Sequence, residues 1–84
     1  MEERILTQHP QQGKQGVNIS RRKYDQVRGA ILASLRANDE MTFKALVEDV
    51  AAKLAGRFEG SIPWYVTTVK LDLEARGEIG RAHV

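Results

Sequence analysis

Three hydroxyl side chains divide the chain into segments that are each suited to an α-helix. Ser20, Thr42 and Ser61 can each accept a hydrogen bond from the free backbone amides of a following helical turn. After each of them, apolar residues recur every three or four positions, which places them on one face of a helix. Such a chain is constrained to a fold in which three apolar faces meet. The predicted helices cover about residues 21–37, 43–54 and 62–76.

The apolar faces of these segments together make one hydrophobic core. The chain has 84 residues, of which 42% are hydrophobic and 29% are charged, as is ordinary for a globular protein. A chain of this length has room for one core and not for two, so we predict one domain over residues 1–84. The predicted core positions are Tyr24, Val27, Ile31, Leu35, Phe43, Leu46, Val47, Val50, Leu54, Ile62, Val66, Val69 and Leu73.

The segments outside the predicted helices contain short runs typical of β-strands. Residues 4–7 form an extended stretch, and residues 79–82 alternate as a short strand does. Between the first of these and the first helix, Pro10 and two glycines indicate a loop, which Val17 and Ile19 are expected to return to the core. Because neither terminal strand has another evident partner, we expect the two to pair in a small sheet.

The C-terminal part of the chain resembles a known DNA-binding fold. Residues 67–81 run Thr-Thr-Val-Lys-Leu-Asp-Leu-Glu-Ala-Arg-Gly-Glu-Ile-Gly-Arg. This order is similar to the end of the recognition helix and the first wing strand of bacterial winged-helix repressors. Val69 and Leu73 would anchor the helix, and Gly77 would permit the reversal into a strand. The resemblance implies a mainly helical, winged-helix-like fold with a helix-turn-helix and a short sheet from the N- and C-terminal strands.

The whole chain also resembles a group of small bacterial proteins of unknown function. The shared pattern comprises His9-Pro10, Gly13-Lys14 with Gly16, the helix of Tyr24, and the helix start from Ser61 to Tyr65. This resemblance supports the fold prediction and implies no particular activity, because a fold alone does not specify a function.

Basic residues gather in the first predicted helix. This helix has only Asp25 to balance its cations, which are Arg21, Arg22, Lys23, Arg28 and Arg36. The first three stand at a helix N-terminus, where the macrodipole disfavours positive charge, so either a bound anion or solvent must accommodate them. If the fold binds duplex DNA, the residues predicted to contact it are Lys14, Arg21, Arg22, Lys23, Ser61, Thr67, Thr68 and Lys70.

The third predicted helix carries a second apolar stripe opposite its core face. Trp64, Leu71 and Ala75 lie on it, with Thr68 between them. The N-terminal segment could cover this stripe, which would place Trp64 in the core. Alternatively, the stripe is an interface with another protein or with a second copy of the chain. Direct DNA contact through Trp64 and Leu71 is disfavoured, because phosphates and base edges require hydrogen-bond donors.

The residues that catalysis and metal binding require are sparse in this chain. There is no cysteine, and His9 and His83 stand near opposite ends, so we expect no metal and no cofactor. Gly13-Lys14 lacks the other residues of a phosphate-binding loop, and no nucleophile, base and acid are suitably spaced, so we expect no enzyme. No apolar run approaches the roughly 18 residues of a membrane span, and the absence of cysteine suits the cytoplasm.

Two functions remain open from the sequence, and in both the chain is a non-catalytic binding module. In the first, it is a cytoplasmic DNA-binding protein that acts as a dimer. In the second, it is a protein-interaction or structural domain that uses Trp64, Leu71 and Ala75. The position of Trp64 in the folded chain discriminates between the two.

Overall fold

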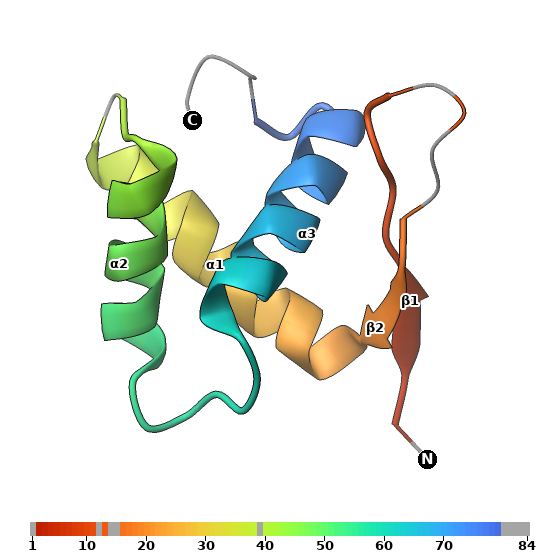
Figure 1. The fold of residues 1–84 in the computed structure, drawn as a ribbon, viewed down its shortest axis with the longest axis horizontal. Helices are drawn as coiled ribbons and strands as arrows, with labels where there is room; N and C mark the ends of the chain where they lie inside the picture. Colours follow the sequence, from red (N-terminus) through yellow and green to blue (C-terminus); the bar gives the residue numbers. More distant parts are fainter. Residues whose placement is uncertain (1, 12, 14–15, 39, 80–84) are drawn as a thin grey trace.

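The computed structural model describes residues 2–11, 13, 16–38 and 40–79. Within these ranges the chain forms three helices and two short strands (Figure 1). Their order is β1 (Arg4–Leu6), β2 (Asn18–Ser20), α1 (Arg21–Ala37), α2 (Phe43–Leu54) and α3 (Ile62–Ala75). The predicted helix bounds are confirmed, with only the last helix ending one residue earlier than expected. No helix of the described ranges is long and apolar enough to cross a membrane.

Each helix starts at the hydroxyl residue that the sequence pattern indicates. Ser20, Thr42 and Ser61 each accept a hydrogen bond from the backbone amide three residues later, at distances of 3.0–3.3 Å. Such a cap contributes about 0.5–2 kcal/mol. At the other end of α3, Gly77 adopts a φ of 76°, in the left-handed region. The amides of Gly77 and Glu78 then donate to the last carbonyls of the helix, which ends it sharply.

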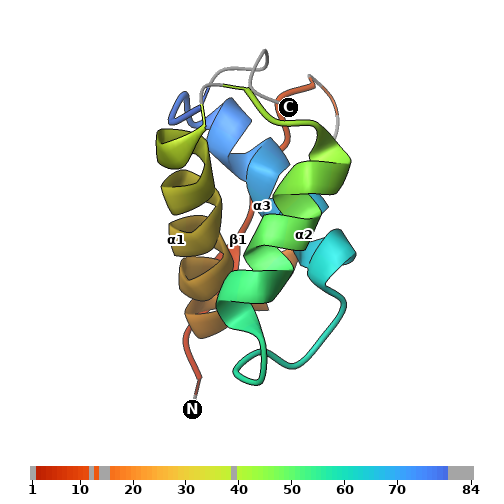
Figure 2. The ribbon, with the colours of Figure 1, turned by 90° about the vertical axis from the view of Figure 1, so that its left-hand side faces the viewer.

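The hydrophobic core lies where the three helices meet. Figure 2 shows α1 and α2 side by side, and both of them contact α3. The fully buried apolar residues are all predicted core positions: Val27, Ile31, Leu46, Val50, Val66, Val69 and Leu73. The prediction for Phe43 is wrong, because this residue is 38% exposed. It is the first residue of α2, and its ring lies at the margin of the core, 5.9 Å from the ammonium of Lys70.

The small sheet pairs β1 with β2 and not with a C-terminal strand. The two strands are antiparallel, with Ile5 opposite Ile19, and a further hydrogen bond joins the Thr7 amide to the Val17 carbonyl at 2.8 Å. The expected pairing of residues 4–7 with 79–82 is therefore corrected: Ile79 is buried but not in a strand, and residues 80–82 lie outside the described residues. The partner nearer in sequence closes a shorter loop, which costs less conformational entropy.

The connection from α2 to α3 has the order of a helix-turn-helix. The linker covers residues 55–61, and both helices contact α1, which the sheet precedes. The fold class is thus confirmed as mainly helical with a small antiparallel sheet. Its topology is consistent with a winged-helix-like arrangement.

Candidate functional site

The start of α3 presents an aromatic side chain to solvent. Trp64, in the first turn, is 46% exposed. Its ring packs edge-on against Tyr65 with 4.9 Å between the ring centroids, and Tyr65 packs edge-on against Phe58 at 5.0 Å. We call Phe58, Trp64 and Tyr65 the aromatic cluster. The ammonium of Lys23 lies 5.6 Å from the Tyr65 ring and 5.8 Å from the Phe58 ring, which brings the start of α1 beside the start of α3.

A glycine in the linker before α3 allows the aromatic cluster to form. Gly60 has a φ of +128°, and a Cβ at this position would lie 3.0 Å from the ring of Tyr65. Any other residue would be strained by this backbone conformation and would also crowd the ring. The linker can therefore turn tightly enough to lay Phe58 against α3.

The N-terminal segment covers only the later part of the predicted stripe on α3. A pocket of about 90 Å³ separates the two, lined by Thr7, Gln8, His9, Gly16, Val17, Thr68 and Leu71. Leu71 and Ala75 are half-buried, whereas Trp64 is exposed, so the prediction that this segment covers Trp64 is wrong. The cause is the point of attachment: the Gln8 amide donates to Asp72, which lies about 12 Å beyond Trp64 along the helix.

The polar side chains predicted to contact DNA from α3 are engaged within the chain. Ser61 caps the helix, and Thr67 Oγ1 donates to the carbonyl four residues earlier at 2.9 Å. Lys70 Nζ lies 3.3 Å from a carboxylate oxygen of Glu74. Thr68 borders the pocket beneath the N-terminal segment. The exposed start of α3 therefore presents an indole where a DNA-reading helix would present a charged donor.

At the start of α1, the chain's own carboxylates lie near the helix N-terminus, where the sequence left either a bound anion or solvent as the neighbour of the cations. Ser20 Oγ donates to a carboxylate oxygen of Glu2 at 2.6 Å. The guanidinium of Arg21 lies 3.4 Å from Asp25 and 3.9 Å from the carboxylate of Glu3. These groups supply negative charge to the helix N-terminus, where the macrodipole favours it.

The predicted phosphate partners of α1 stand in different environments. Arg21 has the acidic neighbours just described, and Lys23 lies over two rings of the aromatic cluster. Arg22 is exposed, and its side chain forms no hydrogen bond or ion pair with the other described residues. Lys14 lies outside the described residues.

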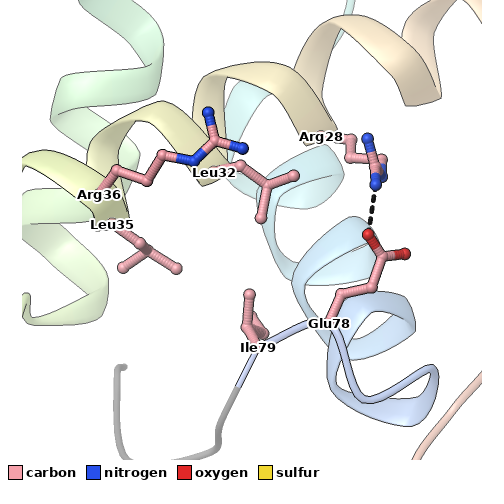
Figure 3. A pocket seen from close by; sticks show the side chains of 6 residues that line it. All are labelled: Arg28, Leu32, Leu35, Arg36, Glu78 and Ile79. Carbon is pink, nitrogen blue, oxygen red and sulfur yellow. Dashed lines mark hydrogen bonds and ion pairs between the residues drawn. The ribbon is translucent and has the colours of Figure 1, made fainter.

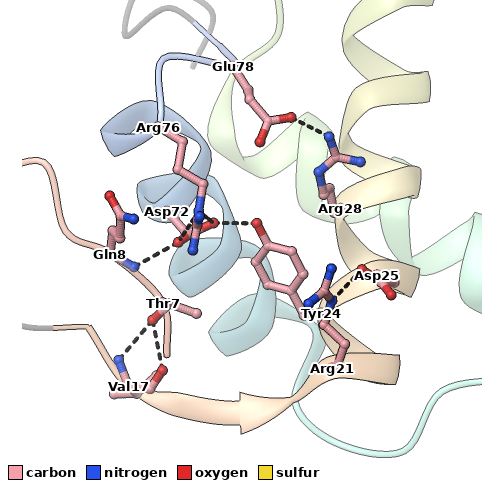
Figure 4. A network of polar contacts seen from close by, with 10 residues as sticks. All are labelled: Thr7, Gln8, Val17, Arg21, Tyr24, Asp25, Arg28, Asp72, Arg76 and Glu78. Carbon is pink, nitrogen blue, oxygen red and sulfur yellow. Dashed lines mark hydrogen bonds and ion pairs between the residues drawn. The ribbon is translucent and has the colours of Figure 1, made fainter. Parts of the chain in front are cut away.

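A buried carboxylate ties three segments of the chain together (Figure 4). Asp72 of α3 is fully buried. It accepts a hydrogen bond from the Gln8 amide at 2.7 Å and another from the Tyr24 hydroxyl. Arg76 Nε lies 2.9 and 3.0 Å from its two oxygens. Burial, and then the hydrogen bond to Asp72, raises the pKa of Tyr24 to about 12, so this hydroxyl keeps its proton and remains a donor.

This network was not predicted from the sequence. Helical spacing contained the signal. Asp72 follows the core residue Val69 by three positions, which places it on the buried face, and it precedes Arg76 by four. A carboxylate on a core face requires hydrogen-bonding partners, because burial of an unpaired charge is very costly. Its distant partners, Gln8 and Tyr24, are visible only in the folded chain.

An ion pair between α1 and the chain after α3 separates two pockets. Arg28 donates to the carboxylate of Glu78, and both residues line both pockets (Figure 3). One pocket, of about 370 Å³, is otherwise lined by Leu32, Leu35, Arg36 and Ile79. The other, of about 330 Å³, is otherwise lined by Ile5, Arg21, Tyr24, Asp25 and Arg76 (Figure 4). The lining of the first pocket is therefore half apolar and half charged, whereas that of the second is largely charged.

His9 lines the small pocket between the N-terminal segment and α3, but neither of the two pockets beside Arg28. Nδ1 of His9 accepts a hydrogen bond from the Gln11 amide at 3.1 Å, and His83 lies outside the described residues. In the part of the chain that the structure describes, no three His, Cys, Asp or Glu side chains are grouped so that they could hold a metal ion.

Comparison with known proteins gives a family and no named relative. No curated protein and no solved structure matches the chain. A family model of unknown function matches residues 4–84, which is nearly the whole length. This agrees with the resemblance to a group of proteins of unknown function and adds no likeness to winged-helix repressors. The chain belongs to the DUF6958 family, a family of unknown function.

Proposed function

We propose that this domain is a non-catalytic protein-interaction module that pairs with a second copy of itself through the start of α3. The observation that carries the proposal is the 46% exposure of Trp64, which the chain's own N-terminal segment leaves uncovered. Tryptophan is a typical anchor of protein interfaces, where its large apolar surface is removed from water. The neighbouring rings of the aromatic cluster hold Trp64 in a defined position.

The charge pattern of α3 favours a second copy as the occupant of this surface. Residues 61–69 contain no charged side chain, and Lys70, the first one after them, is paired with Glu74. These uncharged residues can meet their own copy across a two-fold axis without repulsion between like charges. A basic partner would find no carboxylate on residues 61–69, and the cation beside the rings is Lys23. Because the aromatic surface is small, we expect a dissociation constant on the order of micromolar or weaker.

Sedimentation equilibrium over a range of concentrations tests the pairing directly. The wild-type mass should rise toward that of a dimer between roughly 1 µM and several hundred µM, and Trp64→Ala should remain monomeric over the same range. Leu6→Ala is the matched control, because Leu6 is also apolar and is 66% exposed, but lies on the outer face of β1. A wild-type protein that stays monomeric throughout, or a Leu6→Ala variant that loses the dimer as Trp64→Ala does, would refute this surface.

Duplex DNA is the second candidate partner, and the exposed Arg22 at the start of α1 favours it. The cations Arg21, Arg22, Lys23 and Lys14 would then supply most of the affinity, because α3 contains one lysine against two carboxylates. Four phosphate contacts predict a log–log salt slope of roughly −3 to −4. The double substitution of Arg21 and Arg22 by glutamine should flatten that slope by nearly 2. If no binding is found at low salt, the DNA candidate is excluded while the pairing through Trp64 is unaffected.

A further inference from the structure

We propose that the charged pocket between α1 and the end of α3 binds an oxyanion of the phosphate class, either free phosphate or the phosphate of a small phosphomonoester. The pocket has a volume of about 330 Å³, and its polar lining consists of Arg21, Tyr24, Asp25, Arg28, Arg76 and Glu78. Its residues Arg76 and Glu78 lie at the opposite end of α3 from Trp64, and none of its lining residues belongs to the aromatic cluster, so the site can be tested separately from the pairing proposed above.

The three arginines that line this pocket come from two parts of the chain (Figure 4). Arg21 and Arg28 come from α1, and Arg76 comes from the end of α3. The lining holds three guanidinium groups and two carboxylates, and Arg76 is also paired with the buried Asp72. The pocket therefore offers an anion several N–H donors but no net positive charge. Guanidinium groups bind phosphate oxygens well, because their planar array of N–H donors matches two oxygens at once.

Arg76 is the arginine best prepared to receive an anion. Its Nε is held 2.9–3.0 Å from the two oxygens of the buried Asp72, which fixes the position of the guanidinium. Its two terminal nitrogens form no hydrogen bond with the other described residues. Asp72 itself is fully buried and already accepts from Gln8 and Tyr24, so it presents no carboxylate to the pocket.

The other two arginines are paired with carboxylates that an incoming anion can replace. Arg21 lies 3.4 Å from Asp25, and both side chains are about half exposed, at 46% and 58%. Arg28 pairs with Glu78, whose side chains are 38% and 32% exposed. Ion pairs at such exposure are weak, because water screens them. A dianion therefore takes the place of Glu78 opposite Arg28. The side chains of Glu78 and Asp25 then turn to solvent.

Tyr24 forms a wall of the pocket and adds no negative charge to it. Its hydroxyl donates to Asp72, and with a pKa of about 12 it stays neutral at ordinary pH. The volume exceeds that of a bare phosphate ion and lies at the lower end of the range for small-molecule pockets, about 300–1,000 Å³. Space for a small organic group on the phosphate therefore remains.

Calorimetric titration of the full chain with inorganic phosphate tests the site, with chloride at equal ionic strength as the blank. Arg28→Gln should weaken phosphate binding by about tenfold, the effect of removing one charged hydrogen-bonding partner. Arg36→Gln is the matched control, because it removes the same charge from the same helix outside this pocket. It should change the affinity by less than about twofold. Equal losses in both variants would show a general charge effect and would overturn the site.

A second variant, Glu78→Gln, should change phosphate binding in the opposite direction. Removing this carboxylate frees Arg28, so phosphate should bind several-fold more tightly. The control Glu48→Gln makes the same change on the exposed face of α2 and should leave the affinity unchanged. Phosphoserine is the second probe: tighter binding than phosphate identifies a phosphomonoester ligand, and equal binding identifies free phosphate. Absence of binding by both probes at tens of millimolar, or weaker binding by Glu78→Gln, would refute the proposal.

Discussion

Gly29, in the middle of α1, is a residue of a type that destabilises helix interiors. It is exposed, its φ is not positive, and a Cβ added there meets no atom within 4 Å. Glycine in a helix interior is unfavourable, because it loses more backbone entropy on folding than alanine does. Nothing in the part of the chain that the structure describes therefore requires glycine at this position.

We predict that Gly29→Ala raises the free energy of unfolding by about 0.5–1 kcal/mol. Urea denaturation monitored by circular dichroism measures the change. Gly60→Ala is the control in the opposite direction, because that glycine has a positive φ and a Tyr65 ring atom 3.0 Å from the added Cβ. A loss of stability in Gly29→Ala would mean that the glycine is needed for the native backbone of α1.

The hydroxyl of Tyr24 should make the free energy of unfolding depend on pH. We predict that Tyr24→Phe lowers the free energy of unfolding by about 1–2 kcal/mol at neutral pH, because buried Asp72 loses a donor. The control is Tyr65→Phe, since the Tyr65 hydroxyl forms no hydrogen bond with the described residues. Chemical denaturation of the three proteins at neutral pH makes the comparison.

The sign of the pH effect follows from the raised pKa of Tyr24. The folded pKa of about 12 lies above the ordinary value of 10.0, so the contribution is fully present below pH 10 and is lost as the pH rises to about 12. The stability difference between wild type and Tyr24→Phe should therefore shrink over that interval. A difference that stays constant from pH 8 to 12 would contradict the hydrogen bond to Asp72.

At the scale of elements, α3 is held by its core face. Val69 and Leu73 are fully buried where α3 meets the other two helices. We predict that alanine at either position costs about 2–4 kcal/mol, the sum of lost transfer free energy and the cavity left behind. Equilibrium denaturation measures this loss. Losses under about 1 kcal/mol at both positions would contradict the packing of α3.

Removal of the N-terminal strand should break contacts with two other elements of the domain. β1 pairs with β2, and the Gln8 amide that follows it reaches Asp72, so deletion of residues 1–8 removes both connections. We predict a fall in Tm of roughly 10 °C, at about 4–8 °C for each kcal/mol in a domain of this size. Thermal unfolding by circular dichroism tests it. A truncated chain that melts within a degree or two of the intact one would show that β1 contributes little.

At the scale of the whole molecule, the small thickness of the domain determines how much of the outer surface of α3 is covered. The principal extents are 33 × 32 × 17 Å, so in its shortest direction the domain has room for about two packed helices. In such a shape a helix has little material on its outer side, and a second apolar stripe cannot be fully covered. This is the physical reason why Trp64 is exposed although Leu71, nearer the N-terminal segment, is half-buried.

The two proposed surfaces should act independently. Trp64 and Arg76 stand about 18 Å apart along α3, which exceeds the screening length of about 8 Å at physiological ionic strength. We predict that Trp64→Ala binds phosphate as wild type does and that Arg28→Gln retains the wild-type mass distribution. Calorimetry and sedimentation of both variants measure this. Loss of both properties in one variant would point to a common structural defect.

The sequence by itself determined the features that depend on neighbouring residues. Helix bounds and caps at Ser20, Thr42 and Ser61 could be predicted, because a cap interacts only three residues away. The buried face of each helix could be predicted from the spacing of its apolar residues. Phe43 was the exception, since a helix end is buried only if another element extends over it.

Only the tertiary structure decided which distant groups meet. The pairing of β1 with β2 was not predicted, because the alternation of a short strand does not identify its partner. Sequence charge counts could not show that Glu2 and Glu3 lie at the start of α1, or that Asp72 is buried with Gln8 and Tyr24. These contacts join residues far apart in the chain, and their geometry is set by how the helices pack, which no local pattern encodes.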